Sequence, residues 1–145
     1  MARRLATIGY ESATLADVIG RLKAAGVQIV IDVRAVAASR RAGFSKTLLA
    51  GSLKAEGIDY LHLRGLGTPK PGREAARAGR IGEMHEIFNA HLEEPEAQSQ
   101  LGQACEVAAD RTAALLCYEA DAGHCHRAIV AGLIQARLGC EVMNL

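Results

Sequence analysis

The chain alternates between short apolar runs rich in β-branched residues and longer segments whose apolar residues recur at helical spacing. The run Val27–Val33, VQIVIDV, is typical of a strand that is buried on both faces. A capping-box pattern begins at Thr14, and Gly26 stands where a left-handed helix end is expected. Strands separated by helices favour parallel pairing, because right-handed crossovers place the helices over the sheet. The alternation therefore predicts an α/β fold.

The same alternation predicts further strands and helices in the rest of the chain. Ser45 is a candidate N-cap, and the helix after it is expected to bury Leu48, Leu49 and Leu53. The segment Gly65–Gly79 holds two prolines and four glycines, so we expect a long loop that leads into a helix. Further helices are expected from residue 95 and over about 125–138, and strands at 5–9, 27–33, 59–63, 112–118 and 141–145.

We predict one domain over residues 1–145, with a loop and helix insertion at about 64–92. Its fold is expected to be a three-layer α/β architecture with a mostly parallel five-stranded sheet and helices on both faces, of Rossmann-like or rhodanese-like topology. In such sheets ligands bind beyond the carboxyl ends of the strands.

The charge and composition of the chain limit the classes of partner that it is expected to bind. The 17 Lys and Arg residues nearly balance the 16 Asp and Glu residues, so no overall field attracts nucleic acid or an anionic membrane. Trp is absent and Phe and Tyr are few, which leaves little for stacking on nucleic-acid bases. No long apolar run is present, and we expect a cytoplasmic protein without a membrane partner. Its four cysteines are then expected to be reduced.

Chemically active side chains follow several predicted strands where each one ends. Tyr10 follows the first strand, Asp32 and Arg34 the second, and Cys117 and Glu119 the fourth. Because the carboxyl ends of parallel strands meet at one edge of the sheet, these side chains are expected to share a pocket. A simpler reading of Asp32 and Arg34 is an internal ion pair at a strand end.

The densest group of candidates runs from the end of a strand to the first turn of a helix: Cys117, Glu119, Cys125, His126 and Arg127. Unpaired backbone N–H groups and the positive end of the helix dipole favour an anion there, and Arg127 can add a bidentate contact. The same field favours the thiolate form of Cys125. Either cysteine is a candidate nucleophile, with His126 or Glu119 transferring protons.

Each cysteine also has a plain packing interpretation. Cys105 and Cys140 are expected to be core residues, whereas Cys117 and Cys125 suit either the core or the site. A zinc site from Cys117, Cys125, His124 and His126 has suitable ligand types. Adjacent His, Cys and His residues do not easily converge on one tetrahedral ion, so we assign no metal ligand and predict no cofactor.

Several motifs together resemble the family called domain of unknown function 488, and the resemblance covers nearly the whole chain. The motifs are Thr7-Ile8-Gly9-Tyr10-Glu11, Asp32-Val33-Arg34, Ser39-Arg40, Gly43-Phe44-Ser45-Lys46, His62-Leu63-Arg64, Leu66-Gly67-Thr68-Pro69-Lys70, Leu116-Cys117-Tyr118-Glu119 and Cys125-His126-Arg127. The resemblance implies that all the candidates named below are site residues. From their chemistry we assign catalytic roles to Cys117, Glu119, Cys125 and His126, and substrate or anion contacts to Tyr10, Asp32, Arg34, Ser39, Arg40, Lys46 and Arg127. The resemblance supplies no reaction.

A more distant likeness, at the level of the fold, is to rhodaneses and cysteine phosphatases. Those families also place a cysteine between a strand and a helix, but they close a tight loop between cysteine and arginine. The segment from Cys117 to Arg127 is longer and contains a second cysteine. The loop length therefore does not favour a sulfur-transfer or phosphatase reaction.

The leading hypothesis is a cysteine- and histidine-dependent hydrolase or transferase that binds a small anionic or nucleotide-like ligand. One rival is a nucleic-acid-binding or repair-associated domain, and another is a structural or metal-binding domain without turnover. The oligomeric state is not predicted. The basic rim that the first rival requires consists of Arg34, Arg40, Arg41, Lys46, Arg64 and Lys70.

Overall fold

A computed structural model describes residues 4–119 and 125–145 of the protein. Over these residues a parallel five-stranded sheet has the order β3-β2-β4-β1-β5. All pairs are parallel, as the alternating pattern predicts, because each connection crosses over the sheet through helical segments. The strands are β1 (Arg4–Gly9), β2 (Ile29–Asp32), β3 (Asp59–His62), β4 (Ala113–Cys117) and β5 (Glu141–Asn144).

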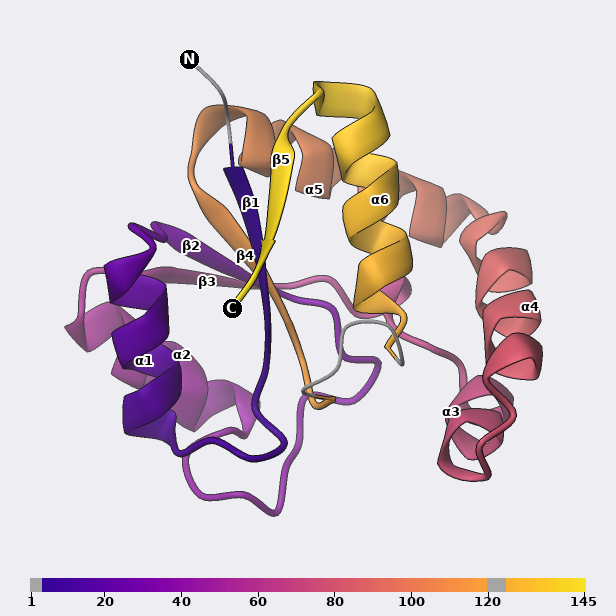
Figure 1. Ribbon diagram of the computed structural model, residues 1–145, viewed down its shortest axis with the longest axis horizontal. Helices are drawn as coiled ribbons and strands as arrows, with labels where there is room; N and C mark the ends of the chain where they lie inside the picture. Colours follow the sequence, from indigo (N-terminus) through magenta and orange to yellow (C-terminus); the bar gives the residue numbers. More distant parts are fainter. Residues whose placement is uncertain (1–3, 120–124) are drawn as a thin grey trace.

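Helices cover both faces of the sheet, which confirms the three-layer architecture (Figure 1). The helices α1 (Leu15–Ala24) and α2 (Lys46–Ala55) lie on one face, and α5 (Pro95–Asp110) and α6 (Arg127–Leu138) lie on the other. No helix in the described part of the chain is long and apolar enough to cross a membrane.

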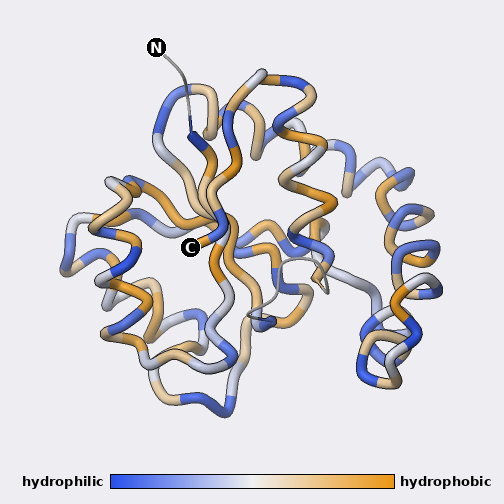
Figure 2. Tube along the Cα trace, viewed as in Figure 1, coloured by the Kyte–Doolittle hydropathy of each residue, from blue (hydrophilic) through white to orange (hydrophobic). Residues whose placement is uncertain are grey.

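The core consists of two apolar clusters, one on each side of the sheet. Alternate residues of each strand point to opposite clusters: Ile29 and Ile31 pack beneath α5 and α6, whereas Val30 packs against α1 and α2. The central strand β4 is buried along its whole length. Figure 2 shows the strands and the inward sides of the helices as the apolar part of the trace. The sheet is therefore the rigid platform on which its carboxyl-edge loops stand.

The helix boundaries follow local chemistry. Thr14 and Asp17 form the reciprocal capping box at the start of α1, and Gly26 adopts a positive φ of 71° just after this helix. Gly139, with φ of 66°, ends α6 in the same left-handed conformation. These positions confirm what the sequence indicated about where α1 and α6 end.

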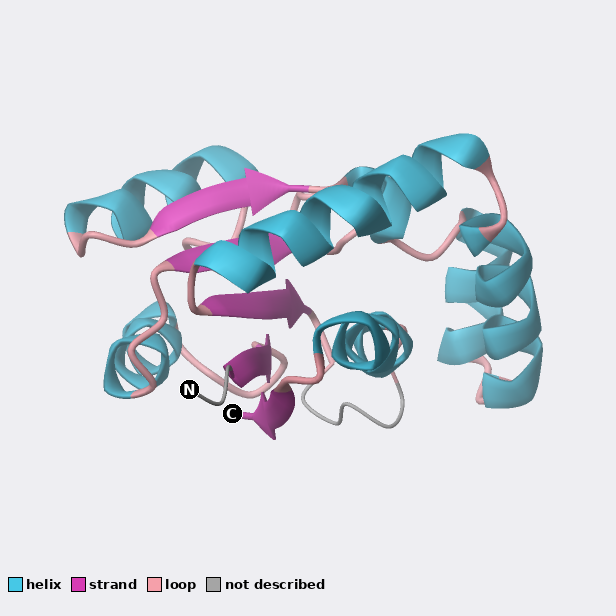
Figure 3. Cartoon of the chain, turned by 90° about the horizontal axis from the view of Figure 1, so that it is seen from above, coloured by secondary structure: helices cyan, strands magenta, loops and turns pink. Residues whose placement is uncertain are grey.

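The segment Gly65–Gly79 departs from the prediction of a long loop. It contains part of a 3₁₀ turn, η1 (Arg64–Leu66), and a complete helix, α3 (Lys70–Arg77), which precedes α4 (Ile81–Leu92). Pro71 is tolerated because it lies in the first turn of α3, where its missing N–H leaves no hydrogen bond unmade. Figure 3 shows α3 and α4 beyond the arrowheads of the strands, so they stand at the edge where a ligand would bind.

The helix α2 provides a matched pair of leucines, one of which corrects the sequence analysis. Leu49 is fully buried, whereas Leu48 is 61% exposed although both were expected in the core. We expect Leu49→Ala to lower the free energy of unfolding by about 2–5 kcal/mol, because it leaves a cavity. Leu48→Ala should change it by less than about 0.5 kcal/mol. Urea unfolding of both variants checks this, and equal losses would contradict the assigned face.

Candidate functional site

A buried ion pair stands at the carboxyl end of β2. The Asp32 carboxylate is fully buried and accepts hydrogen bonds from Arg34 Nε at 2.9 Å and from Arg34 Nη2 at 2.7 Å. The backbone N–H of Arg34 donates to the same carboxylate at 3.1 Å. Burial alone would lower the pKa of the Arg34 guanidinium, but Asp32 more than offsets this and raises it. The Arg34 guanidinium is therefore charged and is fixed against the Asp32 carboxylate.

This ion pair connects neighbouring strand ends and the loop between β2 and α2. Arg34 Nη1 donates to the Tyr10 hydroxyl at 3.0 Å and to the Phe44 carbonyl at 2.7 Å. The Tyr60 hydroxyl donates to Asp32, and both burial and this carboxylate raise the pKa of Tyr60. Tyr10 also stacks on Phe44, with ring centroids 4.2 Å apart. One buried cluster thus fixes the ends of β1, β2 and β3.

Asp32 and Arg34 therefore form the internal ion pair that the sequence analysis gave as the simpler reading. Most of the Arg34 donors are occupied by Asp32, Tyr10 and Phe44, although part of the side chain faces the pocket described below. Arg34 is 6% exposed, so it does not belong to a basic surface rim. The nucleic-acid hypothesis loses one of its six cations for this reason.

The thiol of Cys117 lies between a cation and a carboxylate. Arg127 Nη1 donates to Cys117 Sγ at 2.9 Å and also to the backbone carbonyl of Glu119. Cys117 Sγ lies 3.6 Å from Glu119 Oε2, close enough for the thiol to donate to this carboxylate when Cys117 is reduced. Arg127 is the first residue of α6 and is almost fully buried. Its guanidinium therefore acts on the thiol from inside the protein rather than from the solvent side.

Cys125 has a different neighbour. Its Sγ lies 3.5 Å from His126 Nδ1, and His126 Nε2 lies 2.7 Å from the Val33 carbonyl. A carbonyl oxygen only accepts, so Nε2 carries the hydrogen and Nδ1 presents its lone pair to Cys125. Burial, aided by the charge of Arg127, lowers the pKa of His126 to about 4, against the opposing effects of the Val33 hydrogen bond and of Asp32. The imidazole is therefore neutral and a weak proton acceptor near pH 7.

Gly9 permits the close approach that builds this cluster. A Cβ atom at Gly9 would lie 1.7 Å from the Glu119 carbonyl oxygen and 2.8 Å from Arg127 Nη1. Both distances are far below van der Waals contact, so the end of β1 must be glycine for Glu119 and Arg127 to meet there. Steric crowding thus explains why the Gly9-Tyr10 motif begins with glycine.

Cys117 and Cys125 are paired through their sulfur atoms, as in a disulfide, which the expectation of four reduced cysteines did not foresee. Cys105 and Cys140 are free and buried, in agreement with a packing role. The ligand atoms of Cys117, Glu119 and Cys125 all lie within 4.8 Å of one another. His124, the fourth candidate of the zinc hypothesis, lies outside the described residues.

A pocket of about 500 Å³ opens at this edge of the sheet. Cys117, Glu119, Cys125 and His126 form one side of its lining. The loop after β2 forms another side, and α3 and α4 form a third. The residues contributed by the loop and these helices are Ala35, Val36, Ala38, Ser39, Arg40, Arg73, Ala76, Arg77 and Met84, and Thr68 is contributed by the turn before α3. The volume is that of a pocket for a small molecule.

The predicted site residues fall into three groups. Eight of them line the pocket: Tyr10, Arg34, Ser39, Arg40, Cys117, Glu119, Cys125 and His126. Asp32 and Arg127 are buried behind this lining and hold its residues in place. Lys46 is exposed at the start of α2 and is not part of the lining, so the structure does not bring it to the other candidates.

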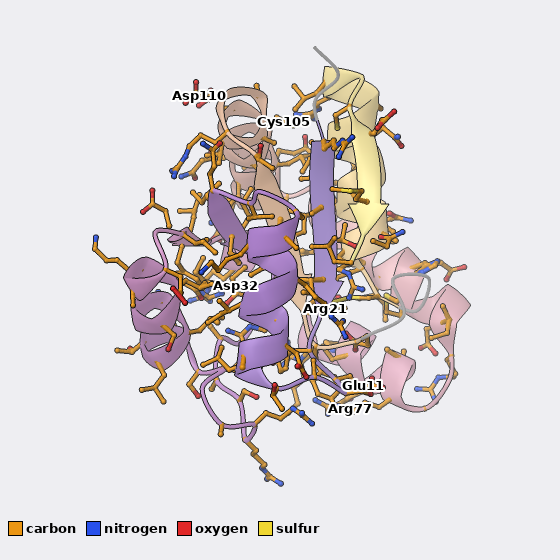
Figure 4. The ribbon with its side chains drawn as sticks, turned by 60° about the vertical axis from the view of Figure 1, so that its left-hand side comes forward. Glu11, Arg21, Asp32, Arg77, Cys105 and Asp110 are labelled. Atoms are coloured by element: carbon orange, nitrogen blue, oxygen red, sulfur yellow. A yellow bond between two sulfur atoms is a disulfide. The ribbon has the colours of Figure 1, made fainter. Side chains whose placement is uncertain are left out.

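Two arginines of the pocket were missed. Arg73 and Arg77 project from α3, and Figure 4 shows Arg77 near the carboxyl edge of the sheet, far from Cys105. The sequence held a signal, because residues four apart share a face of a helix. Reading Gly65–Gly79 as a loop concealed that spacing.

Comparison with known proteins places these observations in one family. A family model described as "Domain of unknown function DUF488" matches residues 14–134. No curated protein and no solved structure matched the chain in the searches. The match covers most of the chain, as the resemblance in the motifs implied.

The buried neutral His126 predicts a pH dependence of stability. In the unfolded chain the imidazole has its ordinary pKa of 6.5, whereas the folded value is about 4. Between these values the unfolded chain binds more protons, so the free energy of unfolding falls as the pH drops, by up to about 1.4 kcal/mol per pH unit. His126→Gln, which keeps a donor for the Val33 carbonyl, should flatten this slope. Urea unfolding of chelator-treated protein between pH 4 and 6.5 measures it; equal slopes would refute the assignment.

Proposed function

Since the chain belongs to the DUF488 family, which is defined without a function, we propose one from the site itself: an enzyme that transfers a group from a small, phosphate-bearing anionic substrate, with Cys117 as nucleophile. The observation that carries the proposal is the position of the Cys117 sulfur, which lies 2.9 Å from Arg127 Nη1 and 3.6 Å from Glu119 Oε2 in the lining of a pocket. A thiol in such surroundings is activated without any external group.

The charge of the pocket favours an anion. Arg40 and Arg77 are exposed and Arg73 is half-buried, and all three belong to the lining. Among the lining residues that the structure describes, Glu119 is the only carboxylate. Guanidinium groups bind phosphate through paired, charge-assisted hydrogen bonds. Arg34 and Arg127 are buried and donate to several protein groups, whereas Arg73 is half-buried and donates through Nη1 to the Thr68 carbonyl. Arg40, Arg73 and Arg77 are therefore the better anion contacts.

Cys117 is a better nucleophile than Cys125. Its neighbour Glu119 is a carboxylate that accepts the thiol proton, and Arg127 stabilises the resulting thiolate. Cys125 faces a buried His126 whose pKa of about 4 makes it a poor proton acceptor. A cation on one side and a proton acceptor on the other are the arrangement that activates a thiol.

The reaction follows from these positions. The Cys117 thiolate forms a bond to the electrophilic atom of the substrate, and the leaving group departs with the bonding electron pair. Glu119, which took the thiol proton, returns it to the leaving group. Water or an acceptor hydroxyl then attacks the covalent intermediate and loses its proton to Glu119, and the bond to sulfur breaks with its electron pair on Cys117, which restores the thiolate. The step requires the Cys117–Cys125 pair in its reduced form.

The arginines of α3 can be tested directly. The double variant Arg73→Gln/Arg77→Gln should weaken orthophosphate binding by about tenfold or more, because it removes two charge-assisted contacts. Arg21→Gln is the matched control, since Arg21 is an exposed arginine on α1. Isothermal titration of the reduced protein measures both. Equal affinities in the double variant and the control would place the anion elsewhere.

The nucleophile is tested by turnover of p-nitrophenyl phosphate under reducing, chelating conditions. Cys117→Ser should lower kcat by at least about 100-fold while orthophosphate still binds. Cys105→Ser, which alters a buried thiol in α5, should leave kcat unchanged. Turnover that survives Cys117→Ser would exclude this residue as nucleophile. Absence of any turnover in the wild-type protein would contradict a phosphate-transfer reaction.

A further inference from the structure

We propose that Cys117, Glu119 and Cys125 form a binding site for a thiophilic divalent cation such as Zn²⁺. One ligand atom from each residue lies within 4.8 Å of the other two, so a single ion reaches all three with small side-chain adjustments. The two cysteines are buried and the glutamate is half-buried, which shields the ion from competing water. This inference does not depend on the proposed reaction, because binding is measured directly.

The donor types favour a soft or borderline cation. Cysteine thiolates select zinc and related ions over magnesium and calcium, and a carboxylate is an accepted third ligand of zinc. Zinc with three protein ligands keeps its fourth position for water or substrate. Because all three residues line the pocket, that fourth position would face the pocket rather than the core.

Charge balance supports the assignment. Two thiolates and one carboxylate exceed the charge of a divalent cation by one negative charge. Arg127 supplies the compensating positive charge, with Nη1 at 2.9 Å from Cys117 Sγ. Groups that donate to metal ligands in this way orient them and hold the deprotonated form. Arg127 also holds the Glu119 backbone, so a single side chain positions two of the three ligands.

The backbone spacing suits a bridging ion better than a covalent bond. The Cα atoms of Cys117 and Cys125 are 7.7 Å apart, beyond the range of about 4.4–6.8 Å that disulfides span. A permanent disulfide would therefore require the two backbones to approach. Two sulfurs on one tetrahedral zinc, each at about 2.3 Å, stand about 3.8 Å apart, so a bridging ion suits more widely separated backbones than a disulfide does.

His126 is not a ligand of this site. Its Nε2 is committed to the Val33 carbonyl, and its Nδ1 faces Cys125 Sγ. It therefore contacts Cys125 from the side and is not one of the three residues whose ligand atoms converge. The donor set differs from the one weighed from the sequence, which took two histidines in place of Glu119.

The test is a titration of the reduced, chelator-treated protein with Co²⁺, followed by competition with Zn²⁺. We expect thiolate-to-cobalt charge-transfer absorption that saturates at one equivalent and disappears when Zn²⁺ is added. Cys117→Ser and Cys125→Ser should each lower the affinity and the intensity of this absorption. Glu119→Gln, which keeps both thiols, should weaken binding by about tenfold while the absorption remains.

Cys105→Ser and Cys140→Ser provide the controls, because both residues are buried thiols outside the pocket lining. Neither should change the titration. Absence of the charge-transfer absorption in the wild-type chain would overturn the proposal, as would its loss in the Cys105→Ser or Cys140→Ser variant. The wild-type titration keeps the proposal falsifiable even if a pocket variant fails to fold. It is also independent of p-nitrophenyl phosphate turnover, so the two proposals can fail separately.

Discussion

The buried Asp32–Arg34 ion pair is the interaction on which the carboxyl edge of the sheet depends. Arg34 reaches Tyr10 after β1 and Phe44 before α2, while Tyr60 of β3 donates to Asp32. A buried charge left without its partner is strongly destabilising, so neither member can be removed alone without loosening all of these contacts. The pair fixes the loop after β2, and that loop forms one wall of the pocket.

The second constraint is the close approach of β1, Glu119 and α6. Gly9 leaves room for the Glu119 carbonyl, Arg127 holds that carbonyl, and the same guanidinium reaches Cys117. Arg127, at the start of α6, therefore stabilises the negative charge of a thiolate at Cys117. Its position in the sequence had instead suggested a direct contact with a bound anion. The anion contacts fall instead to the arginines of α3 and the loop after β2.

Much of the fold was predictable because its signals are local. Helix ends at Gly26 and Gly139 and the capping box at Thr14 depend on residues a few positions apart. Parallel strands then bring their carboxyl ends together whatever the details, which is why Tyr10 and Cys117 were predicted to meet. The direction in which Arg127 points depends on packing between segments that are distant in the sequence. Local sequence patterns therefore do not predict it. Helix α3 was missed because proline and glycine usually indicate a loop. Here they lie in the first turn of the helix, where both are tolerated.

Cys117 and Cys125 give the site mutually exclusive chemical states. A free Cys117 thiolate is a nucleophile, whereas a bound zinc ion or a bond to Cys125 occupies the same sulfur lone pair. A cation would then suppress attack by Cys117 and present a Lewis acid to the pocket. Any assay of the protein therefore has to define both the reductant and the free metal concentration.

The most direct measurement of the central claim compares alkylation of the reduced, chelator-treated protein by iodoacetate and by iodoacetamide, with the modified cysteine identified by peptide mass spectrometry. The two reagents are alike in size, but only iodoacetate is an anion. The account predicts that Cys117 reacts before Cys105 and Cys140, and faster with iodoacetate than with iodoacetamide, because the arginines of the pocket attract the charged reagent. A Cys117 that is inert, or that prefers the neutral reagent, would contradict an activated thiol in an anion-binding pocket.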